Sequence, residues 1–183
     1  MRMWLARALA VLFLGGVVSA AAPSGSWLDV PFVHQEKEGC GSASIAMVMQ
    51  YWSQQQRKPE LGADAGEIQR LLYSTAGHGI YASDLEHYFQ EHGFQTFSFQ
   101  GGWDDLKEHL EKGRPLIVAV KPSHRNPEPH YVVVTGLDWE RRLVMINDPA
   151  QRKLLKEEWA RFEKQWSAVG KWTLLAVPLP SAR

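Results

Sequence analysis

The sequence predicts an α+β fold in which a helical N-terminal lobe is followed by an antiparallel β-sheet. Apolar residues recur at helical spacing between positions 40 and 112, whereas residues 116–177 contain short β-rich runs separated by turns. Helices that precede strands favour this arrangement over the alternating helices and strands of a parallel sheet. We therefore expect the helices to pack on one side and the strands on the other, with a cleft between them.

Four helices are predicted in the first half of the domain, at residues 41–52, 65–73, 83–92 and 103–112. The first has an apolar stripe formed by Ile45, Val48, Met49 and Trp52. The third opens with a capping-box pattern from Ser83 to Glu86 and ends at Gly93. Gly113 ends the fourth helix in the same way.

Strands are predicted at residues 95–99, 116–120, 130–136, 143–147 and 172–177. One helical pattern, at residues 156–166, interrupts the later strands. Residues 30–33 are predicted to be a short extended segment that leads into the first helix.

The first 22 residues are predicted to be a secretory signal peptide and not part of the fold. They have a basic beginning with Arg2 and Arg7, continue with the uncharged run Ala8–Val18, and end in the small residues Ser19–Ala22. The apolar run is short for a membrane span, so we expect cleavage and no stable membrane insertion, and an uncleaved anchor is the alternative. The domain is then residues 23–183, and its expected location is the periplasm or the extracellular space.

The charge balance excludes some classes of partner. The chain has 20 basic and 20 acidic residues, and removal of residues 1–22 leaves 18 basic against 20 acidic. A nearly neutral domain gives no electrostatic reason to expect nucleic acid or an anionic membrane as a partner. The histidines lack metal-ligand spacing and Cys40 has no partner cysteine, so we expect no metal and no cofactor.

Cys40 is the only cysteine, which is unusual in an exported chain, where cysteines normally form disulfides. It lies between Gly39 and Gly41, where a turn becomes the first predicted helix. A helix N-terminus stabilises a thiolate through its unpaired N–H groups and its dipole. Cys40 is therefore a candidate nucleophile, and a buried apolar thiol is the alternative.

His130 and Asp148 are the candidate base and its orienting partner, as a nucleophilic thiol requires. His130 begins one predicted strand and Asp148 ends the next, before Pro149. If Asp138 pairs with Arg142 across the turn, Asp148 lies opposite Val132. Val132 shares a face of the strand with His130, because side chains alternate with period two. The two candidates would then point the same way, whereas His124 lies in a polar loop that does not position it.

Gln35 is a candidate oxyanion donor. Acyl transfer needs hydrogen-bond donors directed at the developing oxyanion. The Gln35 side-chain amide, five residues before Cys40, and the Cys40 backbone N–H could supply them.

These residues resemble the C39 family of bacterial cysteine peptidases, which have a papain-like fold and remove double-glycine leader peptides. The resemblance rests on the motifs QEKEGCGSASIAMVM, GHGI, HYVVVTG and INDPA, and it continues through EEWARFEKQW and WTLLAVP. It implies that Cys40 is the nucleophile, His130 the base, Asp148 its partner and Gln35 the oxyanion donor. Ser42 departs from the proline often found at that position.

The resemblance is to stand-alone secreted members, because no transporter segment or ATP-binding motif accompanies the domain. It implies a cysteine peptidase that acts on a peptide or protein substrate, and the need for a further partner protein is left open. A non-catalytic peptide-binding module on the same scaffold and a thiol acyltransferase or amidase remain alternatives.

Overall fold

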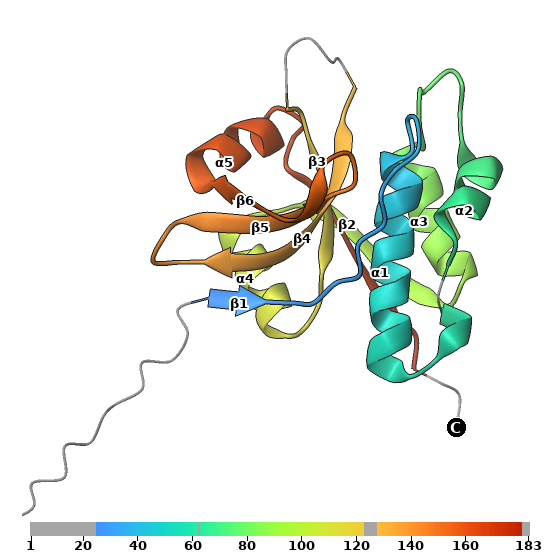
Figure 1. Ribbon diagram of the computed structural model, residues 1–183, viewed down its shortest axis with the longest axis horizontal. Helices are drawn as coiled ribbons and strands as arrows, with labels where there is room; N and C mark the ends of the chain where they lie inside the picture. The colour runs from blue at the N-terminus through green and yellow to red at the C-terminus, as the bar shows by residue number, and fades with distance from the viewer. Residues whose placement is uncertain (1–24, 62, 123–127, 181–183) are drawn as a thin grey trace, which may run out of the picture.

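A seven-stranded antiparallel sheet forms the centre of the computed structural model, which describes residues 25–61, 63–122 and 128–180 (Figure 1). Its main path runs in the order β2-β7-β3-β4-β5-β6, and β1 pairs with β4 outside this path. The strands are β1 (Gly25–Trp27), β2 (Phe94–Gln100), β3 (Leu116–Val120), β4 (His130–Asp138), β5 (Leu143–Asp148), β6 (Arg152–Glu158) and β7 (Trp172–Pro178).

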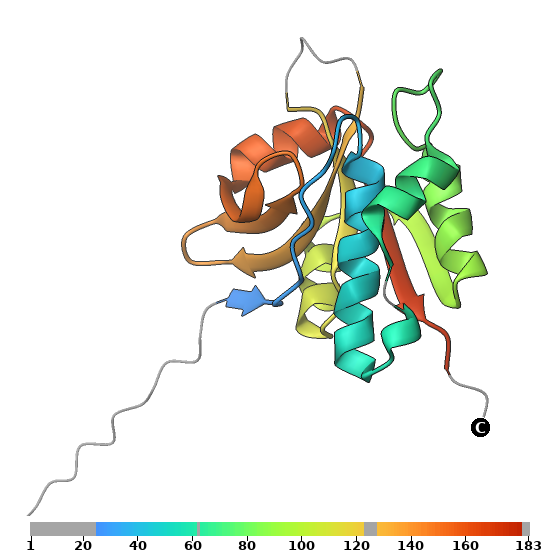
Figure 2. The same cartoon turned by 45° about the vertical axis from the view of Figure 1, so that its right-hand side comes forward.

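Helices cover both faces of this sheet (Figures 1 and 2). They are α1 (Cys40–Gln56), α2 (Ala65–Leu72), α3 (Ala82–Glu91), α4 (Trp103–Glu111) and α5 (Trp159–Ser167), with a short 3-10 turn at Pro59–Leu61. α1, α2 and α3 contribute to one core, which includes Ile117 and Val133 from the sheet. α4 and α5 contribute to a second core, which includes the alternate strand residues Val118 and Val132.

The prediction that the helices of residues 40–112 pack on one side is wrong for α4. Leu106 and Leu110 of α4 pack against Val118 and Val134, on the face that α5 also covers. The apolar spacing of an amphipathic helix shows which side of the helix is buried. It does not show which face of a sheet receives it, and here the edge strand β2 separates α3, on one face, from α4, on the other.

α1 is the central helix of the first core. Every residue from Gly41 to Met49 is buried, so its first turns are enclosed on all sides and do not carry a single apolar stripe. A Cβ on Gly41 would lie 3.0 Å from Cβ of Ile80, so glycine permits the loop before α3 to approach the start of α1 closely.

Three further local predictions need correction. The strand β1 lies at residues 25–27, where no strand was predicted. The first three residues of the predicted helix 156–166 belong instead to the strand β6. α3 begins at Ala82 with no side-chain cap, so Ser83 lies inside the helix and its hydroxyl bonds to the Asp84 side chain instead.

In the part of the chain that the structure describes, no helix combines the length and apolar character needed to cross a membrane.

Candidate active site

Cys40 lies at the first position of α1, preceded by the N-cap residue Gly39. The first bond of the helix joins the Ala43 N–H to the Gly39 carbonyl oxygen at 3.0 Å. The N–H groups before Ala43 therefore lie outside the repeating helical pattern, beside the thiol. Cys40 is only partly buried, so its sulfur is accessible from the adjoining cleft.

The His130 ring connects Asp148 to Cys40. Its Nε2 lies 2.7 Å from Oδ1 of Asp148, and the ring also interacts with the Cys40 side chain. Both members of the His130–Asp148 pair are shielded, with side chains only 14% and 5% exposed. Shielding from water strengthens their electrostatic interaction.

The surroundings of His130 favour its protonated form. Burial lowers its pKa, but the hydrogen bonds to Asp148 and Cys40 and the negative charges of both residues outweigh burial and raise the pKa to about 9. Burial raises the pKa of Asp148, but the hydrogen bond and charge of His130 hold it below its usual value. The geometry thus supports an imidazolium between two acidic groups.

Asp148 has a fixed orientation because its carboxylate accepts three hydrogen bonds. Besides His130, the backbone N–H of Ala150 donates to Oδ1 at 3.0 Å, and Nε2 of Gln151 donates to Oδ2. The preceding residue, Asn147, is fully buried; it donates to the carbonyl oxygen of Val30 and accepts from the backbone N–H of Leu154. These contacts tie the end of β5 to its neighbours.

A β-bulge brings His130 and Asp148 to the same face of the sheet. The turn pairs Asp138 with Leu143, not with Arg142 as predicted. If this observed register continued along the whole hairpin, Asp148 and His130 would lie on opposite faces of the sheet. The register shifts between Val134 and Gly136, where β4 contains one extra residue. Beyond the bulge Val133 faces Asn147, which puts Asp148 level with Val132. The predicted relationship holds although the predicted turn was wrong.

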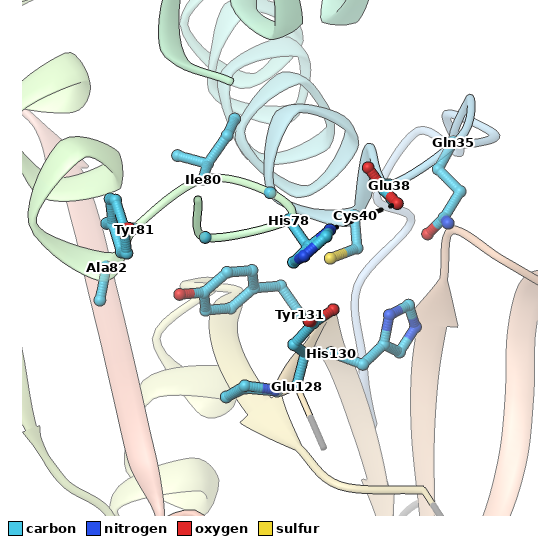
Figure 3. A pocket seen from close by; sticks show the side chains of 13 residues that line it. Gln35, Glu38, Cys40, His78, Ile80, Tyr81, Ala82, Glu128, His130 and Tyr131 are labelled. Carbon is cyan, nitrogen blue, oxygen red and sulfur yellow. Dashed lines mark ion pairs between the residues drawn. The ribbon is translucent and has the colours of Figure 1, made fainter. Parts of the chain in front are cut away.

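Gln35 lies at the edge of the same cleft, and its side chain extends toward the region between Cys40 and His130 (Figure 3). Its backbone N–H donates to the Pro149 carbonyl oxygen at 2.9 Å. Its buried Oε1 has no hydrogen-bond partner among the described residues. A half-turn of the terminal amide exchanges oxygen and NH2, so this group can present either an acceptor or two donors to the cleft.

The cleft has a volume of about 330 Å³ and contains Gln35, Cys40 and His130 in its lining. One wall is the loop of residues 77–82, which leads into α3, and another is residues 128–131 at the start of β4 (Figure 3). Such a cleft, lined by side chains from segments distant in the sequence, is a common setting for an active site.

Three residues of this site were not predicted. Asn147 and Gln151 hold the segment around Asp148, and Glu38 lines the cleft beside Cys40. A polar residue at the end of the apolar run LVMIN was a signal for Asn147, whereas no spacing rule indicates Gln151 or Glu38.

The rejected candidate His124 lies outside the described residues. Within those residues, no group of three or more His, Cys, Asp or Glu side chains could hold a metal ion.

The fold is the papain-like fold of C39 peptidase domains. The chain belongs to the Peptidase_C39 like family, whose sequence model matches residues 27–174. No curated protein matches the chain.

Solved structures share this fold at low sequence identity. A protein from Bacillus anthracis assigned as a C39-like peptidase is 18% identical with a TM-score of 0.69, over 84% of this chain and 97% of that one. The peptidase domain of Streptococcus ComA, a transporter involved in quorum sensing, is 21% identical with a TM-score of 0.61, over 80% and 97%. A double-glycine-motif protease from an AMS/PCAT transporter, in complex with its leader peptide, is 20% identical with a TM-score of 0.62, over 84% and 94%.

Proposed function

We propose that this protein is an exported cysteine peptidase in which Cys40, His130 and Asp148 form the catalytic triad. The observation that carries the proposal is the position of the His130 ring, which is hydrogen-bonded to Asp148 and interacts with the Cys40 side chain. Membership of the C39-like peptidases and the leader peptide bound to one structural relative support a peptide as substrate.

In the proposed reaction, the Cys40 thiolate attacks the carbonyl carbon of a peptide bond and forms a tetrahedral intermediate. The Gln35 amide and the Cys40 N–H donate to its oxyanion. The His130 imidazolium gives its proton to the leaving amine, and the C–N bond breaks to leave a thioester on Cys40. Water then attacks the thioester and gives a proton to His130, and the thiolate departs with release of the carboxylic acid product.

Asp148 has an orienting role in this scheme. It holds Nε2 of His130, which leaves Nδ1 to exchange the proton with Cys40 and the substrate. Its two further hydrogen bonds, from Ala150 and Gln151, keep the carboxylate in place while the imidazole changes charge.

Thiol labelling followed by a cleavage screen tests this proposal. The domain of residues 23–183 is treated with a thiol-directed peptidase probe, and the modified residue is identified by mass spectrometry. A peptide library then reports cleavage by the wild type and by Cys40→Ala. We expect labelling of Cys40 and cleavage that is lost in the variant. A folded protein that binds peptides but cleaves none of them, in the wild type as in the variant, would establish the non-catalytic module instead.

The proposed export rests on the signal-like residues 1–22, which lie outside the described residues. Expression of the whole chain in a bacterial host, followed by fractionation and N-terminal sequencing, tests it. We expect a mature protein outside the cytoplasm that begins near Pro23. Retention of the full-length chain in the cytoplasm would contradict export without affecting the proposed chemistry.

A further inference from the structure

The cleft beside Cys40 has an acidic lining. Two carboxylates, Glu38 and Glu128, line it together with the imidazoles of His78 and His130, and no lysine or arginine does so among the residues that the structure describes. This is a local feature, since the whole chain has equal numbers of acidic and basic residues. Lys37 lies next to Glu38 in the sequence, but it lines a neighbouring depression on the surface and not the cleft.

Glu38 is held in place by contacts with Tyr73 and His78. The Tyr73 hydroxyl donates a hydrogen bond to its Oε2. Nδ1 of His78 lies 3.9 Å from Oε1, and Figure 3 draws this ion pair. The hydrogen bond from Tyr73 holds the pKa of Glu38 below its usual value, with a smaller contribution from Lys37. Glu38 therefore carries a negative charge at neutral pH, two residues before Cys40, and its side chain remains 32% exposed.

Further negative charges act on the floor of the cleft. Tyr131 lines it next to His130 and is almost fully buried. Burial raises the pKa of its hydroxyl, and the charges of Cys40, Asp84 and Glu86 raise it further. Asp84 and Glu86 belong to the start of α3 and act on this hydroxyl from outside the lining of the cleft.

We infer that the cleft selects peptide segments that carry a cationic group close to the bond under attack, with Glu38 as the residue that determines this specificity. The cationic group is a lysine or arginine side chain or a free amino group, and Oε1 of Glu38 receives it. The inference rests on the proposed function for the peptide nature of the ligand, but the charge selectivity of the cleft is testable without turnover.

Charged methanethiosulfonates measure this selectivity at Cys40 itself. The thiolate displaces a sulfinate from the reagent and forms a disulfide, so the rate reports how readily each reagent reaches the sulfur. The reagents are the trimethylammonium-ethyl and sulfonato-ethyl compounds, and each rate is divided by its rate with 2-mercaptoethanol. We expect Glu38→Gln to slow the cationic reagent and accelerate the anionic one, each on the order of 5-fold.

Two control variants separate charge from structure. Glutamine keeps an acceptor for the Tyr73 hydroxyl, so Glu38→Gln should preserve the loop. Tyr73→Phe removes that hydrogen bond but keeps the Glu38 charge, and it should retain most of the selectivity. Glu91→Gln removes one charge at the opposite end of α3 from the cleft and should leave the rate ratio unchanged. Equal ratios in the wild type and Glu38→Gln would overturn the inference.

Paired peptides then test the substrate class. Arginine is compared with citrulline, which has a similar shape but no charge, at each position around the cleaved bond. We expect arginine to raise kcat/KM at one or more positions in the wild type but not in Glu38→Gln. If labelling is selective but no peptide is cleaved, the peptidase proposal fails and the charge selectivity stands. If peptides are cleaved with equal arginine-to-citrulline ratios in both proteins, only the inference fails.

Discussion

The backbone N–H of Gln35 donates a hydrogen bond to the carbonyl oxygen of Pro149, at 2.9 Å. This bond joins the segment before Cys40 directly to the loop that follows Asp148. The candidate oxyanion donor is therefore positioned by the backbone, independently of what its side chain contacts.

Replacement of Gln35 by alanine should lower kcat by roughly 10²-fold and change KM little. The variant keeps the backbone bond to Pro149 and removes only the side-chain donor, which acts on charge that develops in the transition state. Steady-state kinetics on a cleaved peptide give both constants. The control is Glu36→Ala, an exposed neighbour, which should leave both constants near those of the wild type. An increase in KM alone would instead assign Gln35 to ground-state binding.

His130 should titrate near pH 9 in the wild type and at lower pH in Cys40→Ser and in Asp148→Asn, because each variant removes a negative partner of the imidazolium. The pH dependence of the ring 15N chemical shifts measures this directly. An unchanged His130 titration in both variants would show that neither partner interacts with the ring in solution.

The same raised pKa predicts how His130 affects stability. The folded value, about 9, lies above the unfolded value of 6.5, so the stabilisation by the charged imidazole is complete below pH 6.5 and is lost as the pH rises through 9. The difference in free energy of unfolding between the wild type and His130→Gln should decrease over that range, by at most about 3 kcal/mol. Urea titrations at several pH values measure it, and a difference that grows with pH would contradict this interpretation.

Asp148→Asn should retain some activity, because Asp148 orients the imidazole and does not itself transfer the proton. We expect kcat/KM to fall more than 10²-fold, while Cys40→Ala abolishes turnover. Activity equal to that of the wild type would remove Asp148 from the proposed triad.

Gln151→Ala should shift the acid limb of the pH–rate profile to higher pH. The hydrogen bond from Gln151 helps to hold the pKa of Asp148 down, so its loss lets the carboxylate take up a proton at higher pH and release His130. The exposed neighbour supplies the matched control, Arg152→Ala, whose profile should coincide with that of the wild type. A uniform loss of activity without a shift would indicate general loosening of the loop.

Asn147→Ala should destabilise the fold by about 2 to 4 kcal/mol, because it leaves the carbonyl of Val30 and the N–H of Leu154 without their buried partner. Urea denaturation measures this loss. Thr135→Ala is a comparison at another buried polar position with a single side-chain bond, to the Met145 carbonyl, and it should cost less.

Much of this architecture was predictable because local signals determine it. Glycines at 93 and 113 adopt positive φ after their helices, as C-terminal stops require, and the strand 116–120 has the predicted bounds. Periodicity also placed Cys40 at a helix start.

The features that sequence could not supply depend on non-local packing. The bulge in β4 is set by pairing with β5, and nothing in YVVVTGLD indicates where an extra residue will be accommodated. The position of α4 depends on which face of the sheet has room for Leu106 and Leu110. Glu38 acquires its place only when the loop with Tyr73 and His78 folds back onto the start of α1.

The candidate site spans two layers of the molecule. His130 and Asp148 come from neighbouring strands of one hairpin, whereas Cys40 belongs to the helix that packs on the sheet. The His–Asp pair thus needs only the hairpin, but its contact with the thiol needs α1 to be docked. A molecule with an intact sheet and a displaced α1 would lack the contact between Cys40 and His130 and would not cleave peptides. The rate at which Cys40 reacts with a thiol reagent therefore also reports how firmly α1 is docked on the sheet.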